Sequence, residues 1–306
     1  MYFFNLFIIF YCFVANCFAI DLRQFDIDII FPACGATKQL QCEISELIGK
    51  KIHLPAGGSL YQVFADENVK FEKLDKSLRS SHKILWAVRG GYGVDKIMPL
   101  VVKSDYSKET KKIIIGYSDL TPLMVYFAQK YGWMAINAPM LKDFVLGNKS
   151  KQSYEAIVDF LKNKIKLSIS DLKPLNNFSK NKEISGKVIG GNITCIVSTI
   201  GTKWQIQTKN RILFLEDVNV FGYQLDRLLT HMKNAGIFDN VKAIIFGNFG
   251  VDDNKVGVNQ ILKKFASTLN IPVYKSNKFG HQKDNFPIVL EADGIIKSHT
   301  FVQFVK

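Results

Sequence analysis

A serine, a carboxylate and a histidine, each next to a strand-like stretch, have the types and settings needed for a catalytic triad. Ser118 follows the apolar residues 113–115 and precedes a predicted helix that has Pro122 in its first turn. A serine at a strand-turn-helix corner is displayed at the carboxyl edge of a sheet, where the helix N-terminus favours an oxyanion. This setting suits acyl transfer. A serine before a helix is also commonly just its N-cap, and the second glycine of the usual nucleophile elbow is missing.

The candidate carboxylate ends another apolar run. Residues 212–215 are all apolar and predict a buried strand, and Glu216 and Asp217 follow directly. Open α/β sheets bind ligands at the carboxyl ends of their strands, so we take Glu216 as the acid of the triad. Asp217 could equally cap the amphipathic helix that comes next.

The candidate base is His281, which lies in a glycine-containing loop after the strand-like residues 271–274. The chain has five histidines, and an isolated histidine is usually a surface residue or a satisfied hydrogen-bonding partner. His281 therefore gains its significance from the serine and the carboxylate. No pair of histidines has metal-ligand spacing, and the chain contains neither Cys-x-x-Cys nor His-Glu-x-x-His.

Five short motifs between residues 86 and 281 resemble, in their order, those of the LD-carboxypeptidase family of serine peptidases. This family includes murein tetrapeptide carboxypeptidases and microcin-immunity peptidases. The motifs are Trp-Ala-Val-Arg-Gly-Gly-Tyr-Gly at 86–93, Ile-Gly-Tyr-Ser-Asp-Leu-Thr at 115–121, Val-Ile-Gly-Gly-Asn at 188–192, Phe-Leu-Glu-Asp at 214–217 with Tyr-Gln-Leu-Asp-Arg at 223–227, and Phe-Gly-His at 279–281. Together they are far more specific than any one of them.

The resemblance implies a serine peptidase that uses neither a metal nor an organic cofactor. Ser118 would attack the amide carbonyl, His281 would act as the general base, and Glu216 would orient the imidazole. The resemblance also places the glycine-rich loop beside the nucleophile. We expect the main-chain amides of Gly91 and Asp119 to form the oxyanion hole.

Arg89, Tyr92 and Asn192 complete the expected site as substrate-binding residues. Arg89 is one of few arginines among 40 basic residues, and a guanidinium can hold a carboxylate, such as a peptide C-terminus, with two hydrogen bonds. A plain surface arginine is the alternative. A phosphate-binding role for the loop is disfavoured, because neither Gly-Lys-Ser/Thr nor a suitable Gly-x-Gly-x-x-Gly motif is present.

The order of elements predicts an α/β fold with two units and an active site at their interface. Strand-like and helical stretches alternate over residues 20–147, which predicts a parallel sheet with helices on both faces, in a flavodoxin-like domain. Residues 148–186 are rich in lysine, asparagine and serine and predict a linker. Residues 187–306 predict a second α/β domain, of the swivelling type, which carries the acid and the base of the triad.

Residues 1–19 carry no charged side chain and predict an export signal or an N-terminal anchor. Cleavage after Ala19 is favoured, and a lipoprotein signal at Cys17 is the alternative. We therefore expect a cell-envelope location, periplasmic after cleavage. Membrane association would occur only through an uncleaved or lipidated N-terminus.

The chain is basic, with a net charge of +13, which makes nucleic acid the first partner to consider. The lysines are scattered apart from a concentration between residues 149 and 187, and no nucleic-acid-binding motif accompanies them. A solvated basic surface is therefore the favoured interpretation, and we expect no nucleic-acid partner.

Three functions compete on these grounds. The first is an LD-carboxypeptidase that releases the terminal D-alanine from murein tetrapeptides through an acyl-enzyme. The second is a related serine peptidase that acts on cross-linked murein or on a peptidyl antibiotic. The third is a non-catalytic cell-wall-binding protein, which would tolerate loss of the triad, whereas all three triad positions are filled here. A homodimer is compatible with the family resemblance.

Overall fold

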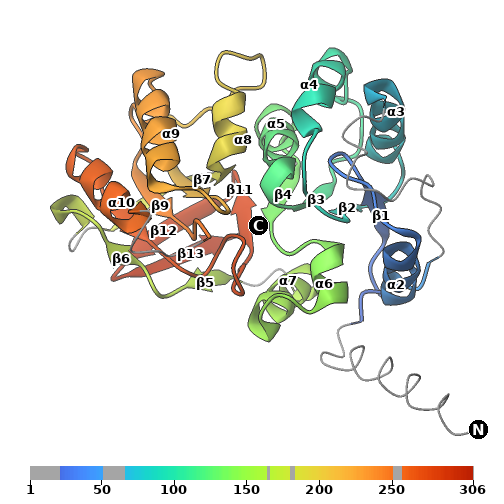
Figure 1. The fold of residues 1–306 in the computed structure, drawn as a ribbon. Coiled ribbons are helices and arrows are strands. Elements are labelled where there is room, and N and C mark those ends of the chain that lie inside the picture. Colours follow the sequence, from blue (N-terminus) through green and yellow to red (C-terminus); the bar gives the residue numbers. More distant parts are fainter. Residues whose placement is uncertain (1–20, 51–65, 164–165, 180–182, 251–256, 306) are drawn as a thin grey trace, which may run out of the picture.

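The computed structural model describes residues 21–50, 66–163, 166–179, 183–250 and 257–305, and Figure 1 shows two units side by side, each built on its own sheet. The first sheet has five strands in the order β1-β2-β3-β4-β11, and the second has eight in the order β5-β13-β12-β7-β8-β9-β10-β6. The expected signal at residues 1–19 lies outside the described residues. Within the described ranges, no helix combines the length and apolarity needed to cross a membrane.

Four parallel strands form most of the first sheet, and helices cover both of its faces. The strands are β1 (Ile27–Ile30), β2 (Ile84–Ala87), β3 (Ile113–Gly116) and β4 (Met134–Asn137). One face packs against α3 (Glu67–Leu78), α4 (Val94–Lys103) and α5 (Thr121–Tyr131), and the other against α2 (Lys38–Ile48), α6 (Leu141–Leu146) and α7 (Lys151–Asn163). The prediction of a parallel sheet with helices on both faces is confirmed.

The strand order of this sheet is sequential, and β1 lies at its edge. A flavodoxin-like order would place the first strand inside the sheet. Each crossover here leads to the next strand in the same direction, and right-handed crossovers that all run one way bring their helices to one face. This accounts for α3, α4 and α5, each of which directly precedes the next strand, lying on one face. Helices α2, α6 and α7 cover the opposite face.

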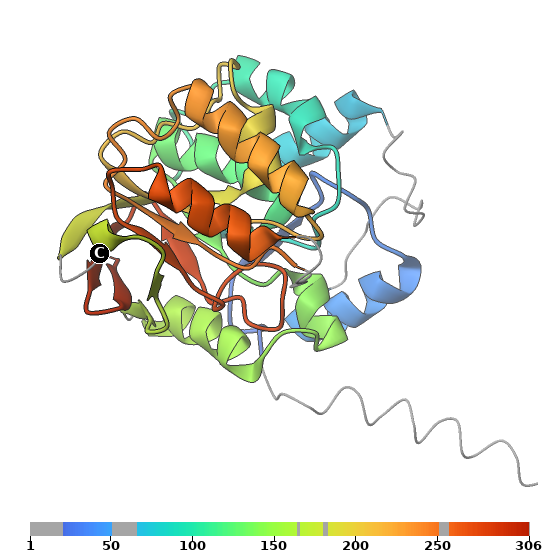
Figure 2. The ribbon, with the colours of Figure 1, turned by 60° about the vertical axis from the view of Figure 1, so that its left-hand side comes forward.

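The second sheet has a parallel centre and antiparallel flanks. The parallel strands are β7 (Ile184–Asn192), β8 (Arg211–Glu216), β9 (Ala243–Phe246) and β10 (Val273–Lys275). The antiparallel strands are β5 (Leu167–Ile169), β6 (Lys173–Pro174), β12 (Asp293–Lys297) and β13 (Thr300–Phe304). Helices α8 (Ile193–Ser198), α9 (Gly222–Asn234) and α10 (Val258–Ser267) join the core on this side, and α9 and α10 run alongside each other (Figure 2).

Two segments cross between the expected domains. The expected linker, residues 148–186, contains α7 and both edge strands of the second sheet, β5 and β6. Near the other end of the chain, β11 (Ile288–Leu290) leaves the second unit and pairs antiparallel with β4 of the first sheet. The main-chain hydrogen bonds of these pairings join segments that a division of the sequence into two consecutive domains would separate.

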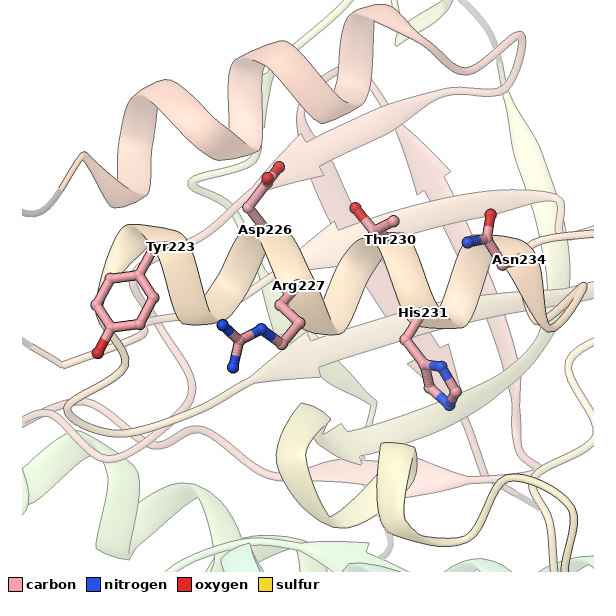
Figure 3. Close-up of a pocket in the computed structure, with 6 residues that line it drawn as sticks. All are labelled: Tyr223, Asp226, Arg227, Thr230, His231 and Asn234. Atoms are coloured by element: carbon pink, nitrogen blue, oxygen red, sulfur yellow. The ribbon is translucent and has the colours of Figure 1, made fainter.

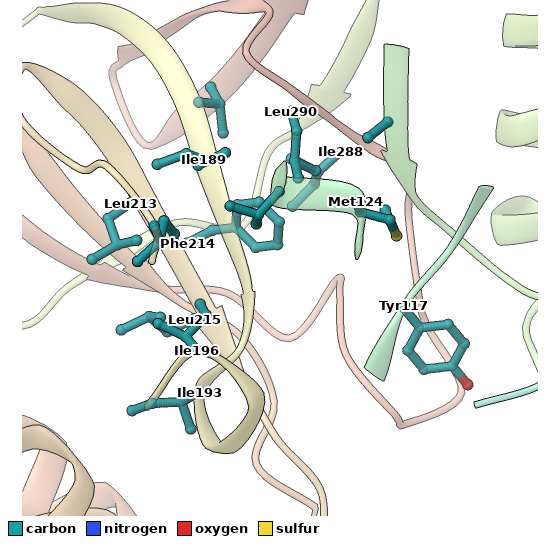
Figure 4. Packing of buried hydrophobic residues seen from close by; sticks show 14 of the residues in the cluster. Tyr117, Met124, Ile189, Ile193, Ile196, Leu213, Phe214, Leu215, Ile288 and Leu290 are labelled. Atoms are coloured by element: carbon teal, nitrogen blue, oxygen red, sulfur yellow. The ribbon is translucent and has the colours of Figure 1, made fainter. Parts of the chain in front are cut away.

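Apolar packing is continuous between the two units. Met124 of α5, Phe214 of β8 and Leu290 of β11 belong to one buried cluster (Figure 4). At its centre the close approach of β7 to β8 requires glycine, because a Cβ at Gly190 would lie 1.8 Å from the carbonyl oxygen of Phe214. Gly190 also has a φ of 147°, which L-residues with a side chain rarely adopt. The parallel centre of the second sheet therefore depends on this glycine.

We expect Gly190→Ala to lower the free energy of unfolding by at least about 3 kcal/mol, because the added methyl group overlaps main chain that cannot move aside. Gly201→Ala is the matched control, since Gly201 also has a positive φ, of 84°, but a Cβ there meets nothing within 4 Å. That control should lose only about 1 kcal/mol from backbone strain. Urea unfolding of the two variants measures the difference, and equal losses would contradict the steric explanation.

Candidate active site

Ser118 begins a sharp turn between β3 and α5. It starts the 3-10 turn η2 (Ser118–Leu120) and has a φ of 64°, in the left-handed region that residues with a side chain usually avoid. The hydroxyl of Thr121 donates a 2.7 Å hydrogen bond to the carbonyl oxygen of Ser118 and closes the turn. Strain of this kind persists only where the surroundings impose it, and it is frequent at functional sites. The turn leaves the serine partly exposed at the carboxyl edge of the first sheet.

Glu216 and His281 form a hydrogen-bonded pair. Nδ1 of His281 lies 2.7 Å from Oε2 of Glu216, although 65 positions separate the two residues along the chain. The Glu216 side chain has no exposed surface, and that of His281 is 15 % exposed. A carboxylate on Nδ1 leaves Nε2 of the imidazole as the nitrogen that can accept a proton from a nucleophile. The predicted contact between acid and base is present.

The charge of Glu216 controls the protonation of His281. Burial disfavours the imidazolium form, but the negative charge and hydrogen bond of Glu216 outweigh burial, so the pKa of His281 is raised above its ordinary value. The second carboxylate oxygen, Oε1, is buried and accepts no hydrogen bond from the described residues. Through Oε2, the carboxylate forms an ion pair with His281 whenever the imidazole is protonated.

Contacts of Tyr117 and Gly90 place Ser118 near the Glu216–His281 pair. The ring centroids of Tyr117 and His281 are 4.9 Å apart, and Tyr117 is the residue directly before Ser118. On the other side, a Cβ built on Gly90 would lie 3.3 Å from the Ser118 hydroxyl oxygen. The glycine-rich loop thus packs over the serine, as expected, and the histidine loop packs against the residue next to it.

The carboxylate of Asp119 anchors this glycine-rich loop. Its Oδ2 accepts a 3.0 Å hydrogen bond from the main-chain N–H of Val94, at the start of α4, where the loop ends. Burial raises the pKa of Asp119 to about 6, although the Val94 bond acts in the opposite direction. Asp119 therefore holds the loop at the cost of burying an acid.

The loop residues differ in their surroundings. Gly91 has a φ of 132°, and a Cβ there would lie 2.3 Å from the sulfur of Cys34, so the main chain approaches closely enough to exclude a side chain. Tyr92 is half exposed, with the Lys96 ammonium 5.6 Å from its ring centre. Nε of Arg89 is buried and has no hydrogen-bond partner among the described residues.

Asn192 and Asp217 form a structural network behind the site. Asn192 is 3 % exposed and caps α8, since its Oδ1 accepts a bond from the Cys195 N–H, while its Nδ2 donates to Asp217. Asp217 also accepts bonds from the N–H and hydroxyl of Thr194. The alternative that Asp217 caps the helix following β8 is wrong, because its carboxylate points back to α8. The side-chain oxygen and nitrogen of Asn192 are already bonded within the fold.

The main chain of Asn192 connects the two units beside the Ser118 turn. Its N–H donates a 3.1 Å bond to Oγ1 of Thr121, the hydroxyl that also closes the Ser118 turn. Residues from both sheets thus share one hydroxyl group. This link fixes the Ser118 turn relative to the unit that carries Glu216 and His281.

Comparison with known proteins agrees with this geometry. Residues 26–138 match the family model of the LD-carboxypeptidase N-terminal domain, and residues 185–296 match that of the LD-carboxypeptidase C-terminal domain. The chain belongs to the LD-carboxypeptidase family. Both halves of the family fold are therefore present, and the expectation from the five motifs is confirmed.

Several members of the family resemble the chain over most of its length. It is 39 % identical to a Rickettsia conorii protein named "Putative carboxypeptidase RC0549", over 92 % of this chain and 91 % of that protein. It is 25 % identical to the murein tetrapeptide carboxypeptidase of Pseudomonas aeruginosa, over 66 % and 68 % of the respective chains. The crystal structure of muramoyltetrapeptide carboxypeptidase from Oxalobacter formigenes superposes with a TM-score of 0.75 at 23 % identity, covering 90 % of this chain and 97 % of that one.

One family motif lines a pocket that contains none of the expected catalytic residues. The residues at 223–227 belong to α9, and a shallow pocket on that helix is lined by Tyr223, Asp226, Arg227, Thr230, His231 and Asn234 (Figure 3). These side chains leave one helix in two rows, with Tyr223, Arg227 and His231 in one of them. The buried face of α9 includes Leu225, Leu229 and Met232.

Two residues near the candidate site were not expected. Thr121 bridges the units, as described above, and Lys149 is a buried lysine whose ammonium donates to the main-chain oxygens of His281 and Gln282. Thr121 is the last residue of the family motif at 115–121, but neither that motif nor the lysine-rich stretch around Lys149 indicates these contacts. Their partners are distant along the chain, so only the folded structure reveals them.

We expect Ser118→Gly to be more stable than Ser118→Ala by about 1 kcal/mol, because glycine adopts a φ of 64° without the strain that alanine retains. Neither variant has a hydroxyl group, so the comparison isolates the backbone. Thermal unfolding of both purified variants measures it. If alanine proved equally stable, the left-handed turn would not be strained.

We expect Asp119→Asn to stabilise the fold at pH 7.5 but much less at pH 4. The pKa of Asp119 is raised from 3.8 to about 6 in the folded state, so the ionised acid is penalised above pH 6 and the penalty disappears as pH falls towards 4. Asparagine retains an oxygen that can accept the Val94 bond. The stability difference between variant and wild type should change by about 1 to 3 kcal/mol between the two pH values. A difference that stays constant in chemical unfolding would contradict the raised pKa.

Proposed function

We propose that this member of the family is a serine LD-carboxypeptidase that releases the terminal D-alanine from murein tetrapeptides. The observation that carries the proposal is the 2.7 Å pair of Glu216 and His281, which packs against the residue preceding the strained Ser118. A structural N-cap serine would need neither a left-handed turn nor a buried acid–base pair beside it. The names of the Pseudomonas aeruginosa and Oxalobacter formigenes relatives support the choice of substrate.

The proposed reaction proceeds in two steps through an acyl-enzyme. In the first step Oγ of Ser118 attacks the carbonyl carbon of the scissile amide while Nε2 of His281 accepts the hydroxyl proton. The C–N bond then breaks, and the imidazolium returns that proton to the amine of D-alanine. In the second step a water molecule, deprotonated by His281, attacks the ester carbonyl. The bond to Oγ of Ser118 then breaks, the imidazolium returns the proton to Oγ, and the shortened peptide leaves. Glu216 stabilises the imidazolium throughout.

Negative charge develops on the carbonyl oxygen in both steps. The main-chain N–H groups of Gly91 and Asp119 are the proposed donors to this oxygen. The close packing of Gly91 on Cys34 and the bond from Val94 to the Asp119 carboxylate hold the two segments in place. Donors fixed in this way stabilise a transition state without having to reorganise.

Arg89 is the proposed anchor for the C-terminal carboxylate of the peptide, and Tyr92 the proposed contact for the rest of the substrate. Nε of Arg89 is a buried donor without a partner among the described residues, and a guanidinium suits a planar, two-point contact with a carboxylate. A carboxypeptidase needs such an anchor because it must distinguish a chain end from an internal bond. We further propose action in the cell envelope, on the basis of the uncharged residues 1–19.

Incubation of the purified chain with disaccharide-tetrapeptide, followed by mass spectrometry, tests the proposed function. We expect the mass of one alanine residue to be lost from the peptide, and Ser118→Ala to reduce the rate by about 10³-fold or more while remaining folded. Undiminished turnover by Ser118→Ala would exclude the serine as nucleophile. An intact tetrapeptide, in a preparation that cleaves cross-linked murein dimers or another peptide, would retain the mechanism and change the substrate. No cleavage of any of these would favour a wall-binding protein.

A further inference from the structure

Lys149 is a buried cation directly behind the proposed base. It lies between α6 and α7, outside the five family motifs, and only 3 % of its surface is exposed. Its Nζ donates two hydrogen bonds of 2.8 Å, to the main-chain oxygens of His281 and Gln282. Burial of an ammonium group is costly unless acceptors replace water, and these two carbonyl groups do so. The lysine therefore depends on the conformation of the histidine loop, and the loop depends on the lysine.

The same ammonium group also contacts the segment that carries the nucleophile. Nζ of Lys149 lies 5.2 Å from the ring centre of Tyr117, a distance at which a cation is attracted to the ring face. The Tyr117 ring in turn packs against the imidazole of His281, at 4.9 Å. One buried charge thus connects the main chain of the base with the residue next to Ser118.

Further hydrogen bonds align the segment around Lys149 with the histidine loop. The N–H of Ser150 donates a 2.7 Å bond to the carbonyl oxygen of Lys283, and the N–H of Asn285 donates a 2.9 Å bond to Oγ of Ser153. The N–H of Lys149 itself donates to the hydroxyl of Tyr154. The main chain of Lys149 is thus held beside the histidine loop, and the two bonds of its ammonium group to that loop fix the group relative to the imidazole.

The charged and titratable groups around His281 come from three directions. Glu216 and Asp217 approach from the end of β8, Lys149 from the segment before α7, and Tyr117, whose hydroxyl faces Asp143, from the end of β3. The two acids favour the imidazolium, whereas Lys149 disfavours it and so acts in the same direction as burial. Burial also lowers the pKa of Lys149, although the acids nearby oppose that shift.

We propose that Lys149 is a positioning residue for the base, which fixes the main chain of His281 against the Tyr117–Ser118 turn and offsets the negative charge that Glu216 and Asp217 impose on the imidazole. A base that remains protonated cannot accept the serine proton, so the offset keeps more of His281 in its reactive neutral form. The kinetic consequence rests on the proposed serine mechanism. The electrostatic consequence does not, because it concerns the titration of His281 alone.

The experiment is a titration of the histidine ring signals by NMR in the wild-type chain, Lys149→Met, Lys149→Gln and Lys151→Met. His281→Gln identifies the His281 signal. Methionine removes both the charge and the hydrogen bonds of Lys149, whereas glutamine removes the charge but retains a donor for the carbonyl groups. Lys151 is the matched control, because it is two positions away and its side chain is 59 % exposed.

We expect the titration midpoint of His281 to rise by about one pH unit in Lys149→Met and Lys149→Gln, and to stay unchanged in Lys151→Met. An unchanged His281 midpoint in either folded Lys149 variant would overturn the proposal, and so would an equal rise in Lys151→Met. If the methionine variant does not fold, the glutamine variant still decides the electrostatic part.

Turnover of the disaccharide-tetrapeptide then tests the positioning part. We expect the acid limb of the rate profile to move to higher pH in both Lys149 variants, and Lys149→Met to lose about tenfold more activity than Lys149→Gln at high pH, where the base is neutral in both. Equal activity of the two variants there would overturn the main-chain role. If the wild-type chain cleaves nothing, the proposed function fails, while the NMR titration still decides whether Lys149 sets the protonation of His281.

Discussion

A carboxylate without exposed surface, Glu216, requires a partner, and His281 is the residue that supplies it. Stable burial of the acid depends on the histidine loop keeping its position. That loop is held by the main-chain bonds to Lys149 and by the packing of His281 on Tyr117. The geometry around the proposed base is thus a set of mutually dependent contacts, because movement of any one of them would expose or isolate a buried charge.

The two-sheet architecture places these contacts at the boundary between the units. Ser118 lies just after the carboxyl end of β3, and Glu216 lies at the carboxyl end of β8. Segments that cross between the two units hold these two strand ends in place relative to each other. Strand β11 joins the first sheet by pairing with β4, and the hydroxyl of Thr121 accepts a hydrogen bond from the N–H of Asn192. An apolar cluster spans the same boundary. The proposed nucleophile and base can follow strands of different sheets because the interface between the units is packed like a single core.

Local strain and buried charge are concentrated where the proposed chemistry occurs. Ser118 adopts a left-handed conformation, Asp119 is an acid with a raised pKa, and Lys149 is a buried ammonium group. Each of these features is unfavourable by itself. The Ser118 turn is closed by the nearby hydroxyl of Thr121, whereas Asp119 and Lys149 bond to segments distant in sequence. Strained backbone and buried charged groups lower the stability of a fold, and both are commonly found at functional sites.

The sequence alone determined the α/β class, the strand-turn-helix corner of Ser118 and the positions of Glu216 and His281 after strands, because apolar runs and their ends are local signals. The sequence pattern did not reveal the sequential strand order, the entry of β11 into the first sheet or the strands within residues 148–186, since strand pairing is a non-local choice. It also assigned Asn192 to substrate, whereas the fold uses its side chain to cap α8. Only the tertiary structure decided that Lys149 faces the base, because a lysine becomes distinctive only when burial deprives it of water and supplies carbonyl groups instead.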